Sequence, residues 1–220
     1  QLINATKLSG RTQGGLGIGV FNAMTKNSYA TIKDTVTGES RKFKTQGFTN
    51  YNLVVVDQAL KNNSYISFTN SNLKSSGYMA DVLATEFRFF TNNLLYSLRG
   101  NGAVSNQYYS DDENRGFRYD LSAGKTSGQY QYELDYGLIS DSIDPSDMGY
   151  LRQNNRVRYD MDISWRQYQP FGIFLSMYNG FSIDYNQQYN PRKFSHAQFR
   201  YNLHFTLRNH TNAWINMEWM

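Results

Sequence analysis

The sequence predicts an all-β fold, a transmembrane antiparallel up-and-down β-barrel in which about twelve strands are visible. Three observations point to this class: long segments of alternating apolar and polar residues, connections that are alternately short and long, and abundant aromatic side chains, with Tyr 18, Phe 14 and Trp 3 in 220 residues. The longest aliphatic run, Leu53–Val56, is far shorter than the ~20 apolar residues of a membrane helix. A helical membrane protein is therefore excluded.

The alternation is clearest between Arg156 and Arg166, where apolar side chains occupy every second position from Val157 to Trp165. Because residues i and i+2 share one face of a strand, this pattern predicts one apolar and one polar face. The same pattern covers residues 117–124, 129–138 and 198–207. Each segment has about ten residues, the length that a tilted strand needs to cross a membrane, whereas strands of soluble proteins average about five or six.

Weaker alternation predicts the remaining strands of the sheet. In chain order they cover residues 2–8, 15–25, 51–60, 64–72, 80–90, 94–105, 172–182 and 213–220. The long connection after the second of these strands contains a hairpin signal of its own. Thr31–Thr37 and Ser40–Thr45 flank a Gly38-Glu39 turn, so we expect some strands to extend beyond the membrane.

The lengths of the predicted connections indicate one rim with short turns and one rim with longer loops. Short connections are expected at 11–14, 61–63, 92–93, 126–128, 167–171 and 208–212, and longer ones at 26–50, 73–79, 106–114, 140–155 and 183–196. In outer-membrane barrels the short turns lie on the periplasmic side and the longer loops on the outside. The alternation therefore predicts the orientation as well as the fold.

A closed barrel pairs every backbone group within the hydrocarbon, so the apolar face of each strand is expected to meet lipid and the polar face to line the interior. Tyrosine and tryptophan are expected at the two membrane interfaces. The predicted lumen-lining residues are Arg118, Asp120, Glu133, Asp135, Arg156, Arg158, Asp160, Asp162, Arg166, Arg200 and His204. The predicted lipid-facing residues are Tyr130, Tyr132, Leu134, Tyr136, Val157, Tyr159, Ile163, Trp165, Phe199, Leu203 and Phe205.

The predicted interior charges are of both signs. Interleaved opposite charges favour cross-strand pairing that joins neighbouring strands, and the alternatives are a water-filled pore or a lumen that holds a plug. The net charge is +4, with basic residues dispersed among acidic ones. Dispersed charges argue against a nucleic-acid groove.

No catalytic, cofactor-binding or metal-binding residue is predicted. The three histidines, His196, His204 and His210, lack an evident constellation of catalytic partners, although an outer-membrane hydrolase stays open as an alternative. The acidic runs at 111–113 and 141–147 lack the glycine and closing glutamate of a calcium loop. Gly15, Gly17 and Gly19 are not a phosphate loop, because no lysine and no helix follow. They leave one face of their strand bare, which suits the close approach of another segment.

Several short motifs occur in a characteristic order. They are Ala5-Thr6-Lys7-Leu8-Ser9-Gly10-Arg11-Thr12, Gly15-Leu16-Gly17-Ile18-Gly19, Asn22-Ala23, Thr49-Asn50-Tyr51, Val56-Asp57-Gln58 and Asp147-Met148-Gly149-Tyr150-Leu151-Arg152. In this the sequence resembles a Bacteroidota outer-membrane β-barrel family of unknown function that usually follows a family-nine-like carbohydrate-binding domain. The resemblance implies that residues 1–220 are part of a larger barrel and that an N-terminal periplasmic or surface domain is absent from this chain. It implies no catalytic residue.

The expected function is a passage or scaffold in the bacterial outer membrane, with glycan-related uptake or export as the process. A non-conducting structural subunit of a larger outer-membrane complex is the alternative from a different class. The expected partners are outer-membrane lipid, lipopolysaccharide and other envelope proteins, with no nucleic acid and no cofactor.

Overall fold

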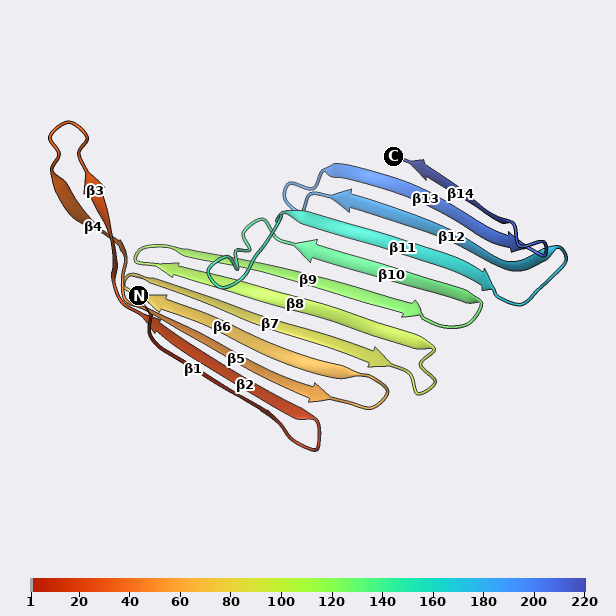
Figure 1. Ribbon diagram of the computed structural model, residues 1–220, viewed down its shortest axis with the longest axis horizontal. Coiled ribbons are helices and arrows are strands. Elements are labelled where there is room, and N and C mark those ends of the chain that lie inside the picture. The colour runs from red at the N-terminus through yellow and green to blue at the C-terminus, as the bar shows by residue number, and fades with distance from the viewer. Residues whose placement is uncertain (1) are drawn as a thin grey trace.

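The computed structural model describes residues 2–220, which form a single large antiparallel sheet and one separate hairpin (Figure 1). The sheet contains twelve strands in the order β1-β2-β5-β6-β7-β8-β9-β10-β11-β12-β13-β14. Their bounds are β1 Leu2–Arg11, β2 Leu16–Thr25, β5 Thr49–Ala59, β6 Tyr65–Ser75, β7 Tyr78–Phe90, β8 Tyr96–Tyr109, β9 Glu113–Lys125, β10 Tyr130–Ile139, β11 Arg156–Gln167, β12 Phe174–Gln187, β13 Phe194–Leu207 and β14 Asn212–Trp219.

Each strand of the sheet pairs with the next one along the chain, apart from the β3–β4 excursion, so the topology is up-and-down. The predicted all-β class, the antiparallel pairing and the strand number are confirmed. Within residues 2–220, β1 pairs only with β2 and β14 only with β13, so the sheet is an open arc and not a closed barrel. Among the same residues, no helix has the length and apolar character needed to cross a membrane.

The two rims differ as expected, but two of the predicted long connections are short. β6 and β7 are joined by residues 76–77, and β8 and β9 by residues 110–112, where the sequence predicted loops of seven and nine residues. The strands extend because polar residues beyond the apolar stretch continue the same pairing register, for example Tyr78 with Tyr109. The long connections that remain are residues 26–48, 140–155 and 188–193.

The hairpin of β3 (Ser28–Lys33) and β4 (Ser40–Gln46) projects from the end of β2 and β5, away from the sheet (Figure 1). Its strands pair with each other in a two-stranded sheet of their own. The turn includes the predicted Gly38-Glu39 but begins earlier, so that it covers residues 34–39. Asp34 accepts hydrogen bonds from the backbone N–H groups of Val36 and Thr37 at 2.7 and 3.0 Å, which hold the pKa of this carboxyl below its ordinary value.

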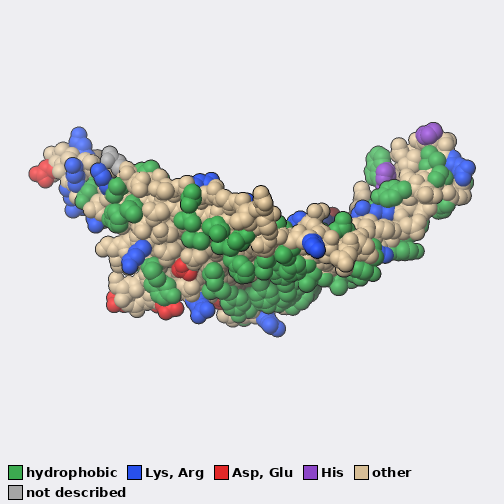
Figure 2. Space-filling view, turned by 90° about the horizontal axis from the view of Figure 1, so that it is seen from below, with side chains coloured by type: hydrophobic (Ala, Val, Ile, Leu, Met, Phe, Trp, Pro, Cys, Tyr) green, Lys and Arg blue, Asp and Glu red, His purple; other side chains and the backbone are tan. Residues whose placement is uncertain are grey.

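The sheet is curved, and its two faces differ in chemistry. Hydrophobic side chains gather on the convex side when the molecule is viewed from the β1 edge (Figure 2). Large apolar side chains on this face are exposed, among them Leu134 at 51 % and Ile163 at 45 %. The opposite, concave face carries most of the charged side chains of the strands. Most of the large apolar side chains of this face are therefore exposed in the described residues.

Candidate functional site

Charged side chains cross the concave face in rows that follow the strand register. Asp135 on β10 lies directly opposite Asp160 on β11, which lies opposite Asp184 on β12. Arg88 and Arg99, on β7 and β8, are also direct partners. Like charges in directly opposed positions destabilise a sheet. This register row therefore carries two arginines at one end and three aspartates at the other, at a cost in stability.

Three ion pairs occur among residues 2–220, namely Arg11–Asp57, Arg99–Glu133 and Arg158–Asp160. Ser122 supports the second pair, because its hydroxyl accepts from Arg99 Nε at 3.0 Å and lies 3.2 Å from Glu133 Oε1. All three pairs are partly exposed, and such pairs contribute about 0–1 kcal/mol each. Cross-strand pairing thus accounts for only some of the charges that the sequence predicted for this face.

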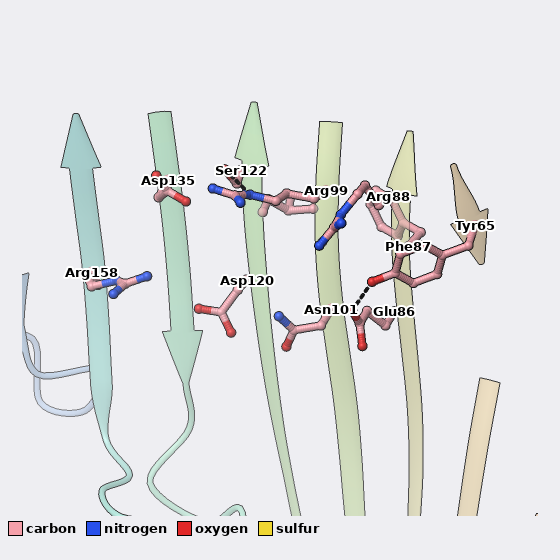
Figure 3. A pocket seen from close by; sticks show the side chains of 12 residues that line it. Tyr65, Glu86, Phe87, Arg88, Arg99, Asn101, Asp120, Ser122, Asp135 and Arg158 are labelled. Carbon is pink, nitrogen blue, oxygen red and sulfur yellow. Dashed lines mark hydrogen bonds between the residues drawn. The ribbon is translucent and has the colours of Figure 1, made fainter. Parts of the chain in front are cut away.

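A groove of about 310 Å³ runs across the concave face over β6–β11. Figure 3 shows that side chains from several strands point into it. At one end the Tyr65 hydroxyl donates to Glu86, and the guanidinium of Arg88 lies 5.5 Å from the Tyr65 ring centroid. At the other end stand Asp120 and Arg158. The groove therefore offers donors, acceptors and an aromatic face to a polar solute.

The absence of a side chain at Gly137 leaves space for the Asp120 carboxylate where the groove crosses β10. Its two register partners are Asp120 and Arg158, on the strands to either side. A Cβ atom at Gly137 would lie 2.5 Å from Asp120 Oδ1, so a side chain here would occupy the space in which this carboxylate lies. The glycine lets the carboxylate lean over β10 toward the arginine.

A second groove, of about 380 Å³, lies nearer the short-turn rim over β10–β12. Its lining includes Glu133, Asp162, Arg166 and Tyr178. The Arg166 guanidinium lies 5.4 Å from the Tyr178 ring centroid, and its Nε atom is buried without a hydrogen-bond partner. Both grooves thus place an arginine against a tyrosine ring, an arrangement in which the ring attracts the cation.

The connection between β10 and β11 folds inward instead of standing above the rim. Residues 140–148 of this segment, here called the inward loop, lie against the concave face of β6–β9. The backbone N–H of Asp144 donates to Ser105 at 3.0 Å, and the Gln107 side chain donates to Asp144 and Asp147 at 3.2 and 3.3 Å. The Tyr78 hydroxyl also donates to Asp147. The loop is therefore held by hydrogen bonds from two neighbouring strands.

Two close contacts seat the inward loop on the sheet. Ile143 is 2 % exposed. A Cβ atom at Gly116 on β9 would lie 2.1 Å from the backbone nitrogen of Ile143. Only a glycine permits this approach, because the opposing atoms are backbone and cannot move aside as a flexible side chain would. Farther along the loop, Ser71 lies 3.4 Å from the sulfur of Met148.

The inward loop is also braced within itself. The hydroxyl and backbone N–H of Ser146, and then the Gln107 amide, hold the pKa of Asp144 below its ordinary value despite partial burial. Its neighbour Asp141 accepts from the Asn190 side chain at 3.0 Å, which ties the segment to the β12–β13 connection. The acidic residues of the run at 141–147 are thus hydrogen-bond acceptors that shape the loop. No group of three candidate ligands that would suit a metal occurs in the described part of the chain.

The register places all of the predicted lumen-lining residues on the concave face and all of the predicted lipid-facing residues on the convex face. Sequence reasoning missed Asp184, because residues 183–196 were expected to form a loop whereas β12 continues to Gln187. It also missed Tyr78, Ser105 and Gln107, which hold the inward loop. The run of small residues over the same strands, including Ala103 and Gly116, is the signal that marks the seat of the loop.

Two residues of the convex face are covered by the chain itself. Val157, expected to meet lipid, is 2 % exposed, and its register partner Leu138 is 6 % exposed. The ring of Tyr189, in the β12–β13 connection, lies 6.0 Å from that of Phe117 on β9. To reach β9 this connection must fold back across β11 and β10, over Val157 and Leu138. Val157 and Leu138 are buried because the β12–β13 connection covers them.

Two rows of aromatic rings cross the convex face. The tyrosine row, near the rim of the long connections, joins β9–β12 with ring centroids 5.0–6.1 Å apart; it consists of Tyr119, Tyr136, Tyr159 and Tyr185. The lower aromatic row joins rings on and near β11–β13 at 5.2–6.0 Å; it consists of Trp165, Phe171, Phe174 and Phe205. Tyr159 and Trp165 are six positions apart on β11, which corresponds to ~20 Å along the strand.

The histidines do not form a catalytic arrangement. His204 lies on the concave face opposite Tyr178 and Trp214, and His196 pairs with Asn186. His210 lies in the β13–β14 turn with a positive φ of 65°. Within residues 2–220 no side-chain hydrogen bond or ion pair involves any of the three, so none has the orienting partner that a general base requires.

The motifs within residues 5–23 and 49–58 meet in space. At the short-turn rim, Arg11 pairs with Asp57, and the adjacent Gln58 side chain donates to the Gly14 carbonyl at 2.9 Å. Near the other rim, the Asn22 side chain donates to the side chains of Asn50 and Asn52, both at 2.7 Å. The motifs therefore define contacts between β1, β2 and β5.

Comparison with known proteins places this architecture in a family. No curated protein and no solved structure matches the chain. A family model described as a domain of unknown function, DUF5916, matches residues 1–220. The chain therefore belongs to the DUF5916 family, whose description assigns no activity.

Proposed function

We propose that this chain is part of a bacterial outer-membrane β-barrel that forms a passage for small polar solutes, narrowed by the inward loop. The observation that carries the proposal is the division of one curved sheet into a charged concave face and an apolar convex face. In a membrane barrel the same division separates a wet interior from lipid.

The convex face supports a membrane location. Aromatic rings collect at the two membrane interfaces because they have an apolar body and a polar edge. The tyrosine row and the lower aromatic row follow this pattern, and Leu134, Met161 and Ile163 lie between them. Strands of 10–14 residues in β5–β13, at ~3.4 Å per residue and with the usual tilt, are long enough to cross a ~25 Å apolar band.

The open edges at β1 and β14 fit a sheet that is part of a larger barrel. Unpaired backbone groups in hydrocarbon cost several kcal/mol each, on the order of the values for buried unsatisfied groups. A membrane-spanning sheet with two free edges must therefore pair these edges. We propose that further strands pair with them, and since barrel diameter grows with strand number, such a barrel would be wider than a twelve-stranded one.

The concave face supports passage. Directly opposed like charges, as in Asp135, Asp160 and Asp184, weaken a sheet that serves only as a scaffold. In a water-filled interior the same rows provide an acidic region, with Arg88 and Arg99 providing a basic one. Two grooves with arginine, carboxylate and tyrosine side chains suit polar, hydroxyl-rich solutes, and glycan fragments are the substrate class that we propose from the family resemblance.

The test is conductance of the full-length protein, purified from the outer-membrane fraction and inserted in planar bilayers. Discrete current steps are expected. Replacing Arg88 and Arg99 with Gln should raise cation selectivity, whereas replacing Asp135 and Asp184 with Asn should lower it. Lys61→Gln, at the short-turn rim, is the matched control and should leave the reversal potential unchanged. The absence of current steps in well-inserted wild-type protein would contradict a passage.

A second candidate is the non-conducting structural subunit. The observation that favours it is the projecting β3–β4 hairpin, which exposes Tyr29 and Phe43 at 57 % each and offers a site for a protein partner. This reading predicts no current and a stable complex in mild detergent. The hydrolase alternative has no supporting geometry in the described residues. It predicts that hydrolytic activity falls when His204 or His196 is replaced by Ala, and no loss in either variant would remove it.

A further inference from the structure

The convex face carries a shallow apolar groove of about 570 Å³ over β8–β12. Its walls include Leu98, Leu121, Leu134 and Met161, and three members of the tyrosine row border it. The volume falls within the ~300–1,000 Å³ of small-molecule sites. The groove lies between the two aromatic rows, at the depth that the proposed function assigns to acyl chains.

A cation stands where the groove meets the rim of the long connections. The β12–β13 connection folds over the convex face, as the contact of Tyr189 with Phe117 shows. Arg192 lies between Tyr189 and Phe194 in the sequence. The ring of Phe194 lies 5.8 Å from that of Tyr185, which borders the groove. Arg192 is exposed and takes part in no ion pair among residues 2–220.

We infer that the convex groove and Arg192 form one binding site for a lipid with a phosphorylated headgroup. An acyl chain would lie in the groove, and the phosphate would bind the guanidinium. Arginine suits this role because its planar fork binds phosphate through two parallel hydrogen bonds. The inference rests on the proposed function, since the groove holds an acyl chain only if the convex face meets lipid.

The occupant that the position favours is the phosphorylated glycolipid of the outer leaflet, lipid A. The long connections lie at this rim, and in outer-membrane barrels that is the outer side. A phospholipid of the inner leaflet would place its phosphate at the opposite rim. Lys125 lies at that rim and borders the concave groove over β10–β12, away from the convex groove, so it serves as the matched control.

The test is native mass spectrometry of the full-length protein extracted from membranes in mild detergent, with added purified lipid A as the probe. Wild-type protein should retain lipid A. Arg192→Gln should weaken the retention about tenfold or more, as expected for the loss of a charge-assisted contact. Lys125→Gln should retain lipid A as the wild type does, and Arg192→Lys should restore part of the affinity.

Equal lipid A retention by wild type and Arg192→Gln overturns the site, as does a phospholipid bound in preference to lipid A. A wild-type protein that binds no lipid overturns it too. Conductance and membrane fractionation of the same samples separate this result from failure of the proposed function. A protein that inserts and conducts normally but shows no effect of Arg192→Gln contradicts the lipid site alone.

Discussion

The guanidinium of Arg11 on β1 reaches across β2 to the carboxylate of Asp57 on β5, and the two form an ion pair over Gly17. The pair joins strands that are not neighbours in the sheet. A Cβ atom at Gly17 would lie 2.3 Å from Asp57 Oδ1 and 3.0 Å from Arg11 Nη2. The bare face predicted for this glycine-rich strand is therefore occupied by the crossing ion pair.

Gly17→Ala should displace the Asp57 carboxylate and break the ion pair. Because both groups are partly exposed, we expect a loss of about 0.5–1 kcal/mol in stability. The measurement is the midpoint of heat-induced unfolding, followed by the mobility shift of the folded protein on unheated gels. Gly19→Ala is the control, since the nearest atom to its Cβ is Val55 Cβ at 3.9 Å.

The effect of Gly17→Ala should disappear when Asp57 is also replaced by Ala, because the methyl group then meets only the flexible end of Arg11, which has already lost its partner. An equal loss in both backgrounds would show that the ion pair is not the cause.

The sequence predicted on which face of the sheet each side chain lies, because successive side chains of a strand point to opposite faces. The faces of β10, β11 and β13 follow directly from the sequence between Gln129 and Leu207. The ends of strands were less predictable. Near the rim of the long connections both faces become polar, as around Lys74 and Gln107, and polar sequence reads as a loop although the backbone pairing continues.

Gly116→Ala should lift the inward loop from the concave face, because the added methyl group meets the backbone of Ile143. We expect faster proteolytic cleavage within residues 140–155 and, in a conducting barrel, larger current steps. Gly102→Ala is the matched control, since its Cβ would have its nearest contact at 3.6 Å. Unchanged cleavage and current in Gly116→Ala would contradict the inward position of the loop.

We expect acid to loosen the inward loop only at a pH below the ordinary aspartate pKa of 3.8. The pKa of Asp144 is lowered from 3.8 by its hydrogen bonds. A depressed pKa contributes stability that is present above the unfolded-state value and is lost as the pH falls through the folded-state value. A fluorophore on Gln153→Cys should therefore report no change between pH 8 and 5 and a transition below pH 3.8.

Asp144→Asn should remove most of that transition, whereas Asp112→Asn, in the β8–β9 turn, should preserve it. A transition near neutral pH would show that another group controls the loop.

The β3–β4 hairpin should be dispensable for folding of the sheet, because its strands pair only with each other. Deleting residues 28–45 leaves Gln46, which donates to Thr49 and Tyr51 at 3.2 and 3.0 Å. We expect the heat-unfolding midpoint and the conductance of this variant to match the wild type. Failure to insert would show that the hairpin takes part in assembly, and loss of a co-purifying protein alone would favour the structural-subunit function.

The position of the inward loop could not be predicted from the sequence. Residues 140–148 carry no periodic signal, and their hydrogen bonds come from Tyr78 and Gln107, which are distant in the sequence and lie on the paired strands β7 and β8. The covering of Val157 by the β12–β13 connection depends in the same way on a contact between distant segments, Tyr189 and Phe117. Local pattern predicts which face a side chain takes but not which loop later covers it.

The central claim, that the concave face meets water and the convex face meets lipid, is tested most directly by single cysteines in this cysteine-free sequence. Ser164→Cys and Ser182→Cys lie on the concave face, and Ile163→Cys and Phe181→Cys are their neighbours on the convex face. In intact outer membranes, a charged thiol reagent small enough to enter the barrel should label the two serine positions, and an apolar maleimide should label the other two. Equal labelling of adjacent positions by the charged reagent would contradict the account.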